Sequence, residues 1–380
     1  MKTKVLLVTE TPPETPNGFG VTLKCLLKET NHDVVFTDAD FKEHGSKLGY
    51  LLAQVPYHTG RKYYMHYKLG KIPEWRGNYS KLWLKSNLKN AYGKVYAFVY
   101  SEGCLNFAHW ISLQLKIPLI IHLADHCESF EKPEVVNLLK DCTSLICITK
   151  EMKEKYQGIL GKKNIEVIHN GAEKICFDIP QPSSAPFSEN NPFVLCFIGG
   201  LFYHLHGDCI EDIADAFTRI REKKPFLRFD LYGQRQPPRF CEQEFKGSGI
   251  IHHGVVMPLE KKNEIMTKAH CFVIPSTFNF SNHRNYRFSF PTKIPELIAS
   301  GRPILSYGPE DTATNHFLKL NKIGVRVHER SILKLADSLN SIIENYSDHI
   351  FESKRIRISL GKYFSAHVMR KKLHSSLNFS

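Results

Sequence analysis

The sequence predicts an α/β fold made of two domains, and three observations support this prediction. Short apolar runs alternate with longer amphipathic stretches through both halves of the chain, a pattern typical of parallel sheets covered by helices. The length of 380 residues suits about two domains, and the 42% of apolar residues is enough for two cores. Residues 180–192 are rich in Pro, Ser and Asn and lack an apolar period, which indicates a linker. We therefore expect a first domain at residues 1–179 and a second at residues 193–357.

Each domain is expected to contain a series of short strands. In the first domain they are predicted at Val5–Val8, Val95–Tyr100, Leu119–Leu123, Ser144–Thr149 and Ile165–Ile168. In the second domain they are predicted at Phe193–Phe197, Leu227–Leu231, Ile250–Gly254, Ala269–Ile274, Ile304–Ser306 and Gly324–Val327. A loop with three prolines and two glycines, Thr9–Gly20, follows the first strand. Gly18 and Gly20 can let a substrate approach the backbone closely, although a plain turn explains them equally well.

The stretch Phe288–Gly308 combines the signals of a loop, a helix and a strand. Pro291 and Thr292 are typical of a helix start, and Gly301 is typical of a helix end. The face that the helix buries is expected to consist of Ile294, Leu297 and Ile298. Because the free N–H groups at the start of such a helix point toward the loop side of a parallel sheet, this stretch predicts an anion site.

Two charged residues make this prediction more specific. Lys293 and Glu296 are separated by three positions and lie on the helix face opposite the apolar residues. A lysine in the first turn can reach a phosphate, and a carboxylate one turn later can accept from two adjacent ribose hydroxyls. Phosphate next to a vicinal diol indicates a nucleotide. The alternative is a solvated surface pair on an ordinary core helix.

Four segments, taken in order, resemble the group-1 glycosyltransferases. They are VIHNGAEKICF at Val167–Phe177, FIGGLFYHLHG at Phe197–Gly207, VIPS at Val273–Ser276 and PTKIPELIASGRPIL from Pro291. The resemblance implies the GT-B fold, in which two Rossmann-like domains face a central cleft. It also implies that a final helix, here at about 358–380, crosses back to the first domain.

The resemblance assigns donor-binding roles to several residues. Gly18 and Gly20 match a glycine pair near the donor phosphates and the acceptor, and Gly199 and Gly200 would let the backbone approach the diphosphate. Thr292, Lys293 and Glu296 match the segment that meets the diphosphate and ribose. The family's cations after the first strand of the second domain are missing, since Gly200 and His206 occupy those places. Lys293, with Arg284 or Arg287 as further candidates, is expected to replace them.

The segment HLADHCES follows the strand at Leu119–Leu123, at an edge where ligands bind in doubly wound sheets. By resemblance to the family, its polar residues would contact the transferred sugar or the acceptor. Asp125 matches best, with His122 and His126 beside it, and these three are the catalytic candidates. Metal binding is an alternative, but no third ligand stands at a fixed spacing. Buried structural histidines are another alternative.

Two departures from the family pattern bear on mechanism. Many members carry two glutamates eight residues apart, and here the first position is Phe288. His169 also replaces the proline of the family's PNG turn. The PTK sequence resembles a subgroup that builds surface polysaccharides. The resemblance implies retention of anomeric configuration and no required metal or cofactor beyond the nucleotide sugar.

The net charge of +13 implies an anionic partner or neighbour. Basic residues alternate with Tyr and Trp between Tyr57 and Lys94, where Glu74 is the sole acidic residue. This composition favours peripheral contact with an anionic membrane or a lipid-linked acceptor over a solvated insertion, and nucleic acid is not expected as a partner.

No apolar run reaches the roughly 20 residues that cross a bilayer, and the ten cysteines contain no C-x-x-C pair. We expect a cytoplasmic protein, at the inner face of the membrane if the contact forms.

Together these observations predict an enzyme, a glycosyltransferase of the polysaccharide-biosynthesis type. It would move a sugar from a nucleotide diphosphate sugar to a hydroxyl of a glycan or lipid-linked acceptor. One alternative is another GT-B enzyme such as a nucleotide-sugar epimerase. The other is a basic protein that binds membrane or nucleic acid and retains a vestigial site.

Overall fold

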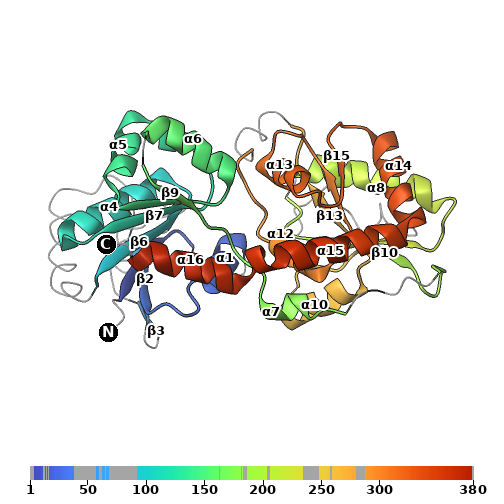
Figure 1. Cartoon of the computed structure of the whole chain (residues 1–380), viewed down its shortest axis with the longest axis horizontal. Helices are drawn as coiled ribbons and strands as arrows, with labels where there is room; N and C mark the ends of the chain where they lie inside the picture. The colour runs from blue at the N-terminus through green and yellow to red at the C-terminus, as the bar shows by residue number, and fades with distance from the viewer. Residues whose placement is uncertain are drawn as a thin grey trace, which may run out of the picture. The chain divides into compact units, whose positions relative to one another are not determined.

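The structure is a computed structural model and is shown in Figure 1. It describes residues 4–378 apart from residues 12, 14, 16, 38–56, 60–61, 65, 68–91, 162, 181, 183–185, 203–205, 234–247, 257–258 and 280–286. The chain divides into two compact units. Unit 1 contains Met1–Gly171, Phe288–Thr292 and Ala366–Ser380, and unit 2 contains Ala172–Arg287 and Lys293–Ser365. The prediction of a two-domain α/β fold is confirmed.

Unit 1 is built on a parallel sheet of seven strands. Their spatial order is β5 (His66–Tyr67), β2 (His32–Thr37), β1 (Val5–Thr9), β6 (Lys94–Val99), β7 (Leu119–Leu123), β8 (Ser144–Cys147) and β9 (Ile165–Val167). The helices are α1 (Gly18–Leu26), α4 (Glu102–Leu115), α5 (Pro133–Asp141), α6 (Lys150–Leu160) and α16 (Ala366–Asn378). Polar side chains cap the first amides of three of these helices, from Asn17 in α1, Ser101 in α4 and Thr149 in α6.

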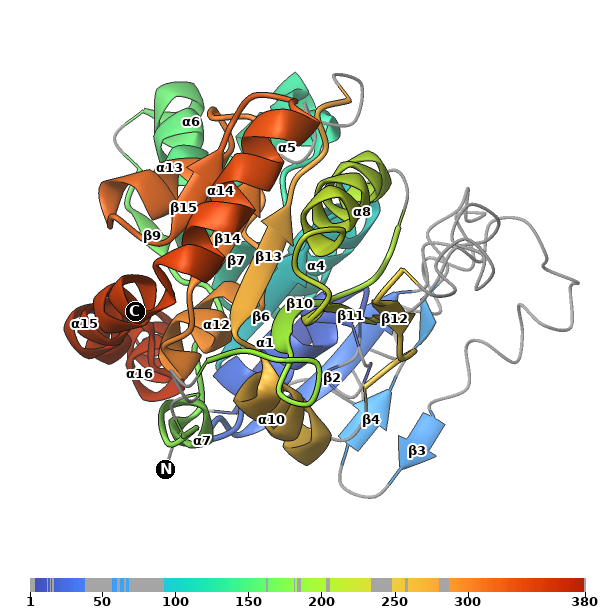
Figure 2. The same ribbon diagram turned by 90° about the vertical axis from the view of Figure 1, so that its right-hand side faces the viewer.

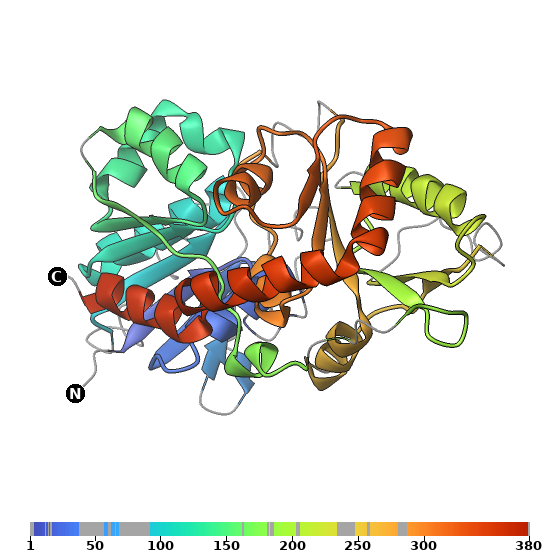
Figure 3. The same cartoon turned by 45° about the vertical axis from the view of Figure 1, so that its right-hand side comes forward.

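The core of unit 1 depends on the end of the chain. Leu7 and Tyr96 of the sheet share a buried cluster with Leu23 of α1 and with Met369 and Leu373 of α16. Helix α16, the last red helix in Figure 3, therefore belongs to this unit's core. The preceding helix α15 (Tyr346–Phe364) belongs to unit 2, so the chain enters unit 1 at Ala366, whereas the sequence analysis placed the start of the crossing helix near residue 358.

Unit 2 contains a second parallel sheet of six strands. Their spatial order is β12 (Ile250–His252), β11 (Leu227–Tyr232), β10 (Phe193–Ile198), β13 (Cys271–Pro275), β14 (Ile304–Tyr307) and β15 (Val325–Val327). The helices are α7 (Lys174–Phe177), α8 (Asp208–Arg221), α10 (Leu259–Lys268), α12 (Ile294–Ser300), α13 (Ala313–Leu320), α14 (Ile332–Glu344) and α15. Helices α8 and α14 pack against each other beside this sheet (Figure 2).

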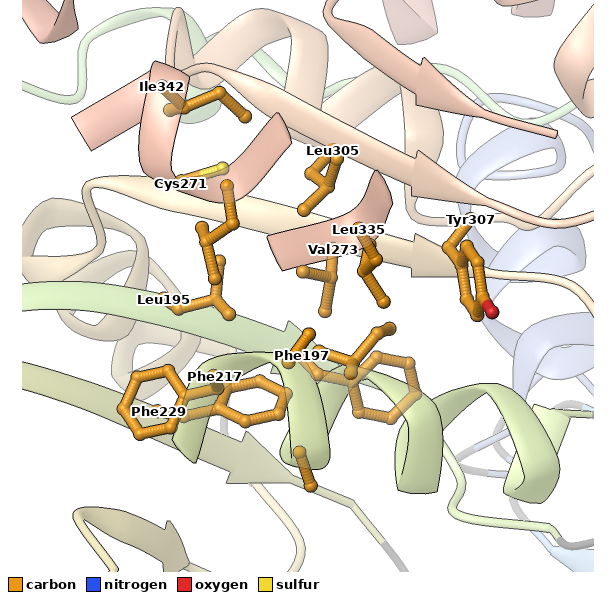
Figure 4. Packing of buried hydrophobic residues seen from close by; sticks show 14 of the residues in the cluster. Leu195, Phe197, Phe217, Phe229, Cys271, Val273, Leu305, Tyr307, Leu335 and Ile342 are labelled. Atoms are coloured by element: carbon orange, nitrogen blue, oxygen red, sulfur yellow. The ribbon is translucent and has the colours of Figure 1, made fainter. Parts of the chain in front are cut away.

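The core of unit 2 is rich in aromatic and branched side chains. Phe197 and Phe229 of the sheet pack with Phe217 of α8 and Leu335 of α14 (Figure 4). Within each strand, the members of this cluster occupy every second position, as expected for residues that face the same side of a sheet. Burial of such large side chains contributes roughly 1.5–3 kcal/mol each to folding.

The strand order identifies where each sheet is suited to bind a ligand. In chain order, the second sheet reads 3-2-1-4-5-6, so its order reverses between β10 and β13. The first sheet reverses in the same way between β1 and β6. Ligands of doubly wound sheets bind at the carboxyl ends of the strands next to such a reversal. For unit 2 this position is marked by the residues directly after β10, Gly199 and Gly200.

Two boundaries lie elsewhere than the sequence placed them. The predicted linker, residues 180–192, lies within unit 2, where the guanidinium of Arg302 donates to the Pro180 carbonyl oxygen at 2.6 Å. Helix α12 begins at Ile294, later than the expected start near Pro291, and ends at Gly301 as expected. The start differs because Phe288–Thr292 packs as part of unit 1.

The basic and aromatic segment Tyr57–Lys94 is described only in part. Two short antiparallel strands, β3 (Tyr57–Thr59) and β4 (Lys62–Tyr64), precede β5, and the description resumes at Tyr92. The predicted membrane contact otherwise lies outside the described residues. In the part of the chain that the structure describes, no helix has the length and apolar character to span a membrane.

Candidate functional site

Lys293 lies at the carboxyl end of β10 in unit 2. Its Nζ donates to the carbonyl oxygen of Ile198 at 2.6 Å and lies 4.1 Å from the ring centroid of Phe197. A Cβ atom on Gly199 would overlap this Nζ. Glycine is therefore required for Lys293 to reach this position, and the two predicted donor residues are brought together.

Removal of water from around Lys293, together with a smaller contribution from repulsion by Lys262, lowers the pKa of its ammonium to about 7. A carbonyl oxygen and a ring face compensate a buried cation only weakly. Among the described residues, no carboxylate forms an ion pair with Lys293. The site is consequently suited to an anion that arrives with the ligand.

Glu296 lies in the first turn of α12 and is only 8% exposed. This burial argues against the alternative of a solvated surface pair. Its carboxylate accepts a hydrogen bond from Nζ of Lys262, which comes from α10. Lys262 could not be predicted from the sequence, because its partner lies 34 residues away along the chain.

His206 lies just before α8, at the same end of the sheet. Its Nε2 contacts the carbonyl oxygen of Gly200, and its ring centroid lies 5.3 Å from that of Phe197. His206 is thus near the loop after β10, where the sequence analysis placed it. Of the two further cations proposed from the sequence, Arg287 lies 3.6 Å from the Asp311 carboxylate, and Arg284 lies outside the described residues.

In unit 1, the segment Phe288–Thr292 runs along the carboxyl ends of the strands. The Ser289 hydroxyl donates to Asp125 at 2.6 Å, and the Thr149 hydroxyl donates to the Phe288 carbonyl at 3.0 Å. The side-chain amide of Asn170 donates to the Thr292 carbonyl. Segments that follow β7, β8 and β9 therefore all hold this stretch in place.

Gly18 also lies beside this segment, since a Cβ atom built on it would be 3.3 Å from Thr292 Oγ1. The amide of Gly20 donates to the side chain of Asn17 at 2.9 Å and so serves to cap α1. Thr292 makes no capping bond to α12, whose N-cap residue is Lys293. The structure thus brings Gly18 and Thr292 together and gives Gly20 a local role.

Asp125 is half-buried at the end of β7. Burial raises the pKa of its carboxyl to about 6, and the hydrogen bonds from Ser289 and from the amide of His126 oppose that rise. A carboxyl that titrates this close to neutrality can exchange protons in the working range of most enzymes. Asp125 remains the strongest catalytic candidate in unit 1.

The two neighbouring histidines have structural partners. The fully buried His122 bonds to the Tyr96 hydroxyl at 2.7 Å and to the Ile168 carbonyl at 2.9 Å, and burial lowers its pKa to about 3. His126 bonds to the Tyr156 hydroxyl at 3.2 Å and lies 3.3 Å from the Glu131 carboxylate. Burial lowers the pKa of His126 as well. These contacts favour the structural alternative for both residues.

Glu10 is a candidate that the sequence analysis missed. It directly follows β1, next to the strand-order reversal of unit 1, and its carboxylate accepts from the amide of Ser101 at 2.8 Å. Burial raises its pKa to about 7. An acidic residue immediately after the first strand was the available signal. Among the described residues, no group of three His, Cys, Asp or Glu side chains could hold a metal ion.

The fold has close counterparts among solved structures. HepE from Anabaena, crystallised with UDP and glucose, has 16% identity and a TM-score of 0.67, with 100% of each chain covered. Sucrose-phosphate synthase from Thermosynechococcus elongatus has 12% identity and a TM-score of 0.63, covering 99% of this chain and 98% of that one. WaaG, a glycosyltransferase involved in lipopolysaccharide biosynthesis, has 11% identity and a TM-score of 0.60, covering 99% and 100%. The architecture is that of the GT-B glycosyltransferases.

The family follows from the second unit. Residues 192–345 match the model of the glycosyl transferases group 1, so the chain carries a group 1 glycosyltransferase domain. This match spans β10 to β15 and includes Gly199, Lys262, Lys293 and Glu296. The predictions of the family and of a glycosyltransferase are confirmed. No curated protein sequence matches the chain significantly.

Proposed function

We propose that the protein transfers a sugar from a uridine diphosphate sugar to the hydroxyl of a glycan or lipid-linked acceptor. The observation that carries the proposal is the placement of Lys293 and Glu296. Both belong to the segment after β13, and Lys293 reaches the carboxyl end of β10. Those two strands flank the reversal of strand order in unit 2, where a doubly wound sheet binds its ligand.

The chemistry of the reaction fits these residues. When the sugar leaves, negative charge develops on the diphosphate, and a buried ammonium stabilises that charge strongly. Lys293 would serve this purpose, with Gly199 and Gly200 allowing the phosphates to approach the backbone. Glu296 would accept from the ribose hydroxyls. Because side-chain cations supply the positive charge, the proposal needs no metal ion and no cofactor besides the donor.

The choice of uridine rests on the solved relatives of the fold. HepE was crystallised with UDP, with UDP-glucose, and with UDP and glucose. We extend this donor class to the present chain.

The acceptor is proposed from the sequence. The PTK subgroup resemblance favours a glycan or a lipid-linked acceptor, and the basic residues between Tyr57 and Lys94 favour contact with an anionic membrane surface. Sucrose-phosphate synthase and WaaG show by their names that the fold serves unlike products. Asp125 would hold the transferred sugar or take the proton of the acceptor hydroxyl. We propose that the anomeric configuration is retained.

A thermal-shift screen tests the donor class. Uridine, guanosine, adenosine and thymidine diphosphate sugars would be added separately to the full chain. A ligand at 100 times its Kd stabilises the folded state by about 2.7 kcal/mol, so the correct donor should raise Tm clearly. No shift with any of them would favour a basic binding protein with a vestigial site. Conversion of the donor to an isomer without any acceptor, seen by chromatography, would favour an epimerase.

A further inference from the structure

Two lysine side chains lie around the start of α12 in unit 2. Lys293 is the N-cap residue of α12 and reaches the Ile198 carbonyl oxygen at the end of β10, and Lys262 comes from α10 and reaches Glu296. Lys262 bonds to Glu296, which stands three positions after Lys293 in the first turn of α12, and repulsion from Lys262 contributes to the lowered pKa of Lys293. Residues 199–207, the loop after β10, contain neither Lys nor Arg, so positive charge at this end comes from elsewhere in the chain.

Within the described part of the chain, the contacts of Lys262 leave part of its hydrogen-bonding capacity unused. An ammonium group has three N–H donors, and one of them is directed at Oε2 of Glu296. A carboxylate can accept about four hydrogen bonds, so Glu296 retains acceptor positions for two ribose hydroxyls. The side chain of Lys262 is 18% exposed, which leaves it accessible to a ligand.

We propose that Lys262 is a second diphosphate-binding cation, which bridges the ribose carboxylate Glu296 and the phosphates held by Lys293. This inference rests on the proposed function and adds a residue to the donor site. Lys262 and Lys293 together replace the cations that the loop after β10 lacks. A bound diphosphate carries enough negative charge to pair with both ammonium groups and would favour the protonated form of Lys293.

Isothermal titration of three ligands against the full chain tests the proposal. Uridine, UMP and UDP share the base and the ribose and differ in the number of phosphates. Lys262→Met should weaken UDP by about tenfold or more and UMP by less, and it should change uridine by less than about threefold. Lys262→Arg keeps the charge and should restore most of the UDP affinity. Lys261→Met, on the exposed neighbour in α10, is the matched control and should bind all three ligands normally.

The outcomes distinguish a failure of the inference about Lys262 from a failure of the proposed function. Equal losses for the three ligands in Lys262→Met would mean that Lys262 acts only through Glu296, and no loss would mean that it has no role. Failure of Lys262→Arg to recover UDP binding would exclude a charge effect. Each of these results overturns the inference alone, because the wild-type protein would still bind UDP. Failure of the wild-type protein to bind UDP overturns the proposed function itself.

Discussion

Individual side chains in this protein are placed by partners that are distant in sequence. Asp125 and Ser289 are 164 positions apart, and Lys262 and Glu296 are 34 apart, so no local pattern could pair them. Lys293 and Glu296 were predictable because both follow from one short helical segment. The prediction of a catalytic role for His122 is disfavoured by contacts that the sequence could not show, since both of its ring nitrogens bond inside the core.

Lys293 should make donor binding dependent on pH. In the free protein its pKa is about 7, and a bound diphosphate favours the charged form, which raises that pKa in the complex. The UDP affinity should therefore be full below pH 7 and fall as the pH rises above 7, by up to about tenfold per unit. Calorimetry at pH 8 in buffers of different ionisation enthalpy should show proton uptake. Lys293→Arg should abolish this dependence, and equal wild-type affinities at pH 7 and pH 9 would contradict the assignment.

Ionisation of Asp125 should determine how the enzymatic activity falls on the acid side of its pH profile. Its pKa of about 6 means that the ionised form is lost as the pH falls through 6, and turnover should fall with it. Asp125→Asn should lower kcat by about 100-fold or more. Because the Ser289 hydrogen bond lowers this pKa, Ser289→Ala should move the acid limb to higher pH. Asp141→Asn, on the exposed end of α5, is the control, and an unmoved limb in Ser289→Ala would refute the role.

At the scale of elements, most strands of the two sheets were predictable, because each is a short apolar run. The helix starts were less predictable. Helix α12 begins at Ile294 because the residues before it are held by hydrogen bonds that Asn170 and Thr149 donate and by the bond that Ser289 donates to Asp125. Tertiary contacts thus overrode a local start signal at Pro291 that would otherwise have been sufficient.

The loops after β10 and β11 are packed so closely that only glycine fits between them. Gly233 has a φ of +154°, and a Cβ atom there would overlap the carbonyl oxygen of Gly199. Gly233→Ala should therefore destabilise the protein by about 3 kcal/mol and weaken UDP binding, because it displaces the Gly199 loop. Gly254→Ala is the control: its φ is +75°, but its Cβ would meet nothing within 4 Å. Denaturant unfolding gives the free energy of unfolding of both variants. An equal loss in the two would mean that backbone strain, and not the overlap with Gly199, causes the destabilisation.

At the scale of the whole molecule, the sequence predicted the fold more completely than the path of the chain. Alternation of strands and helices, together with length, was sufficient for two parallel sheets. The return of the last helix to unit 1 was expected from the family resemblance, whereas the return of Phe288–Thr292 was not. Such returns depend on long-range packing, as in the contacts of α16 with the cluster around Leu7 and Leu23. The sequence pattern does not encode that pairing locally.

The central claim is that a nucleoside diphosphate binds to unit 2 at the carboxyl end of β10. The most direct measurement is a crystal structure of the protein soaked with UDP. We predict that the diphosphate lies within hydrogen-bond distance of Lys293 Nζ and that the ribose hydroxyls donate to Glu296. UDP bound elsewhere, or bound at this end of the sheet with Glu296 directed away from the ribose, would contradict the account.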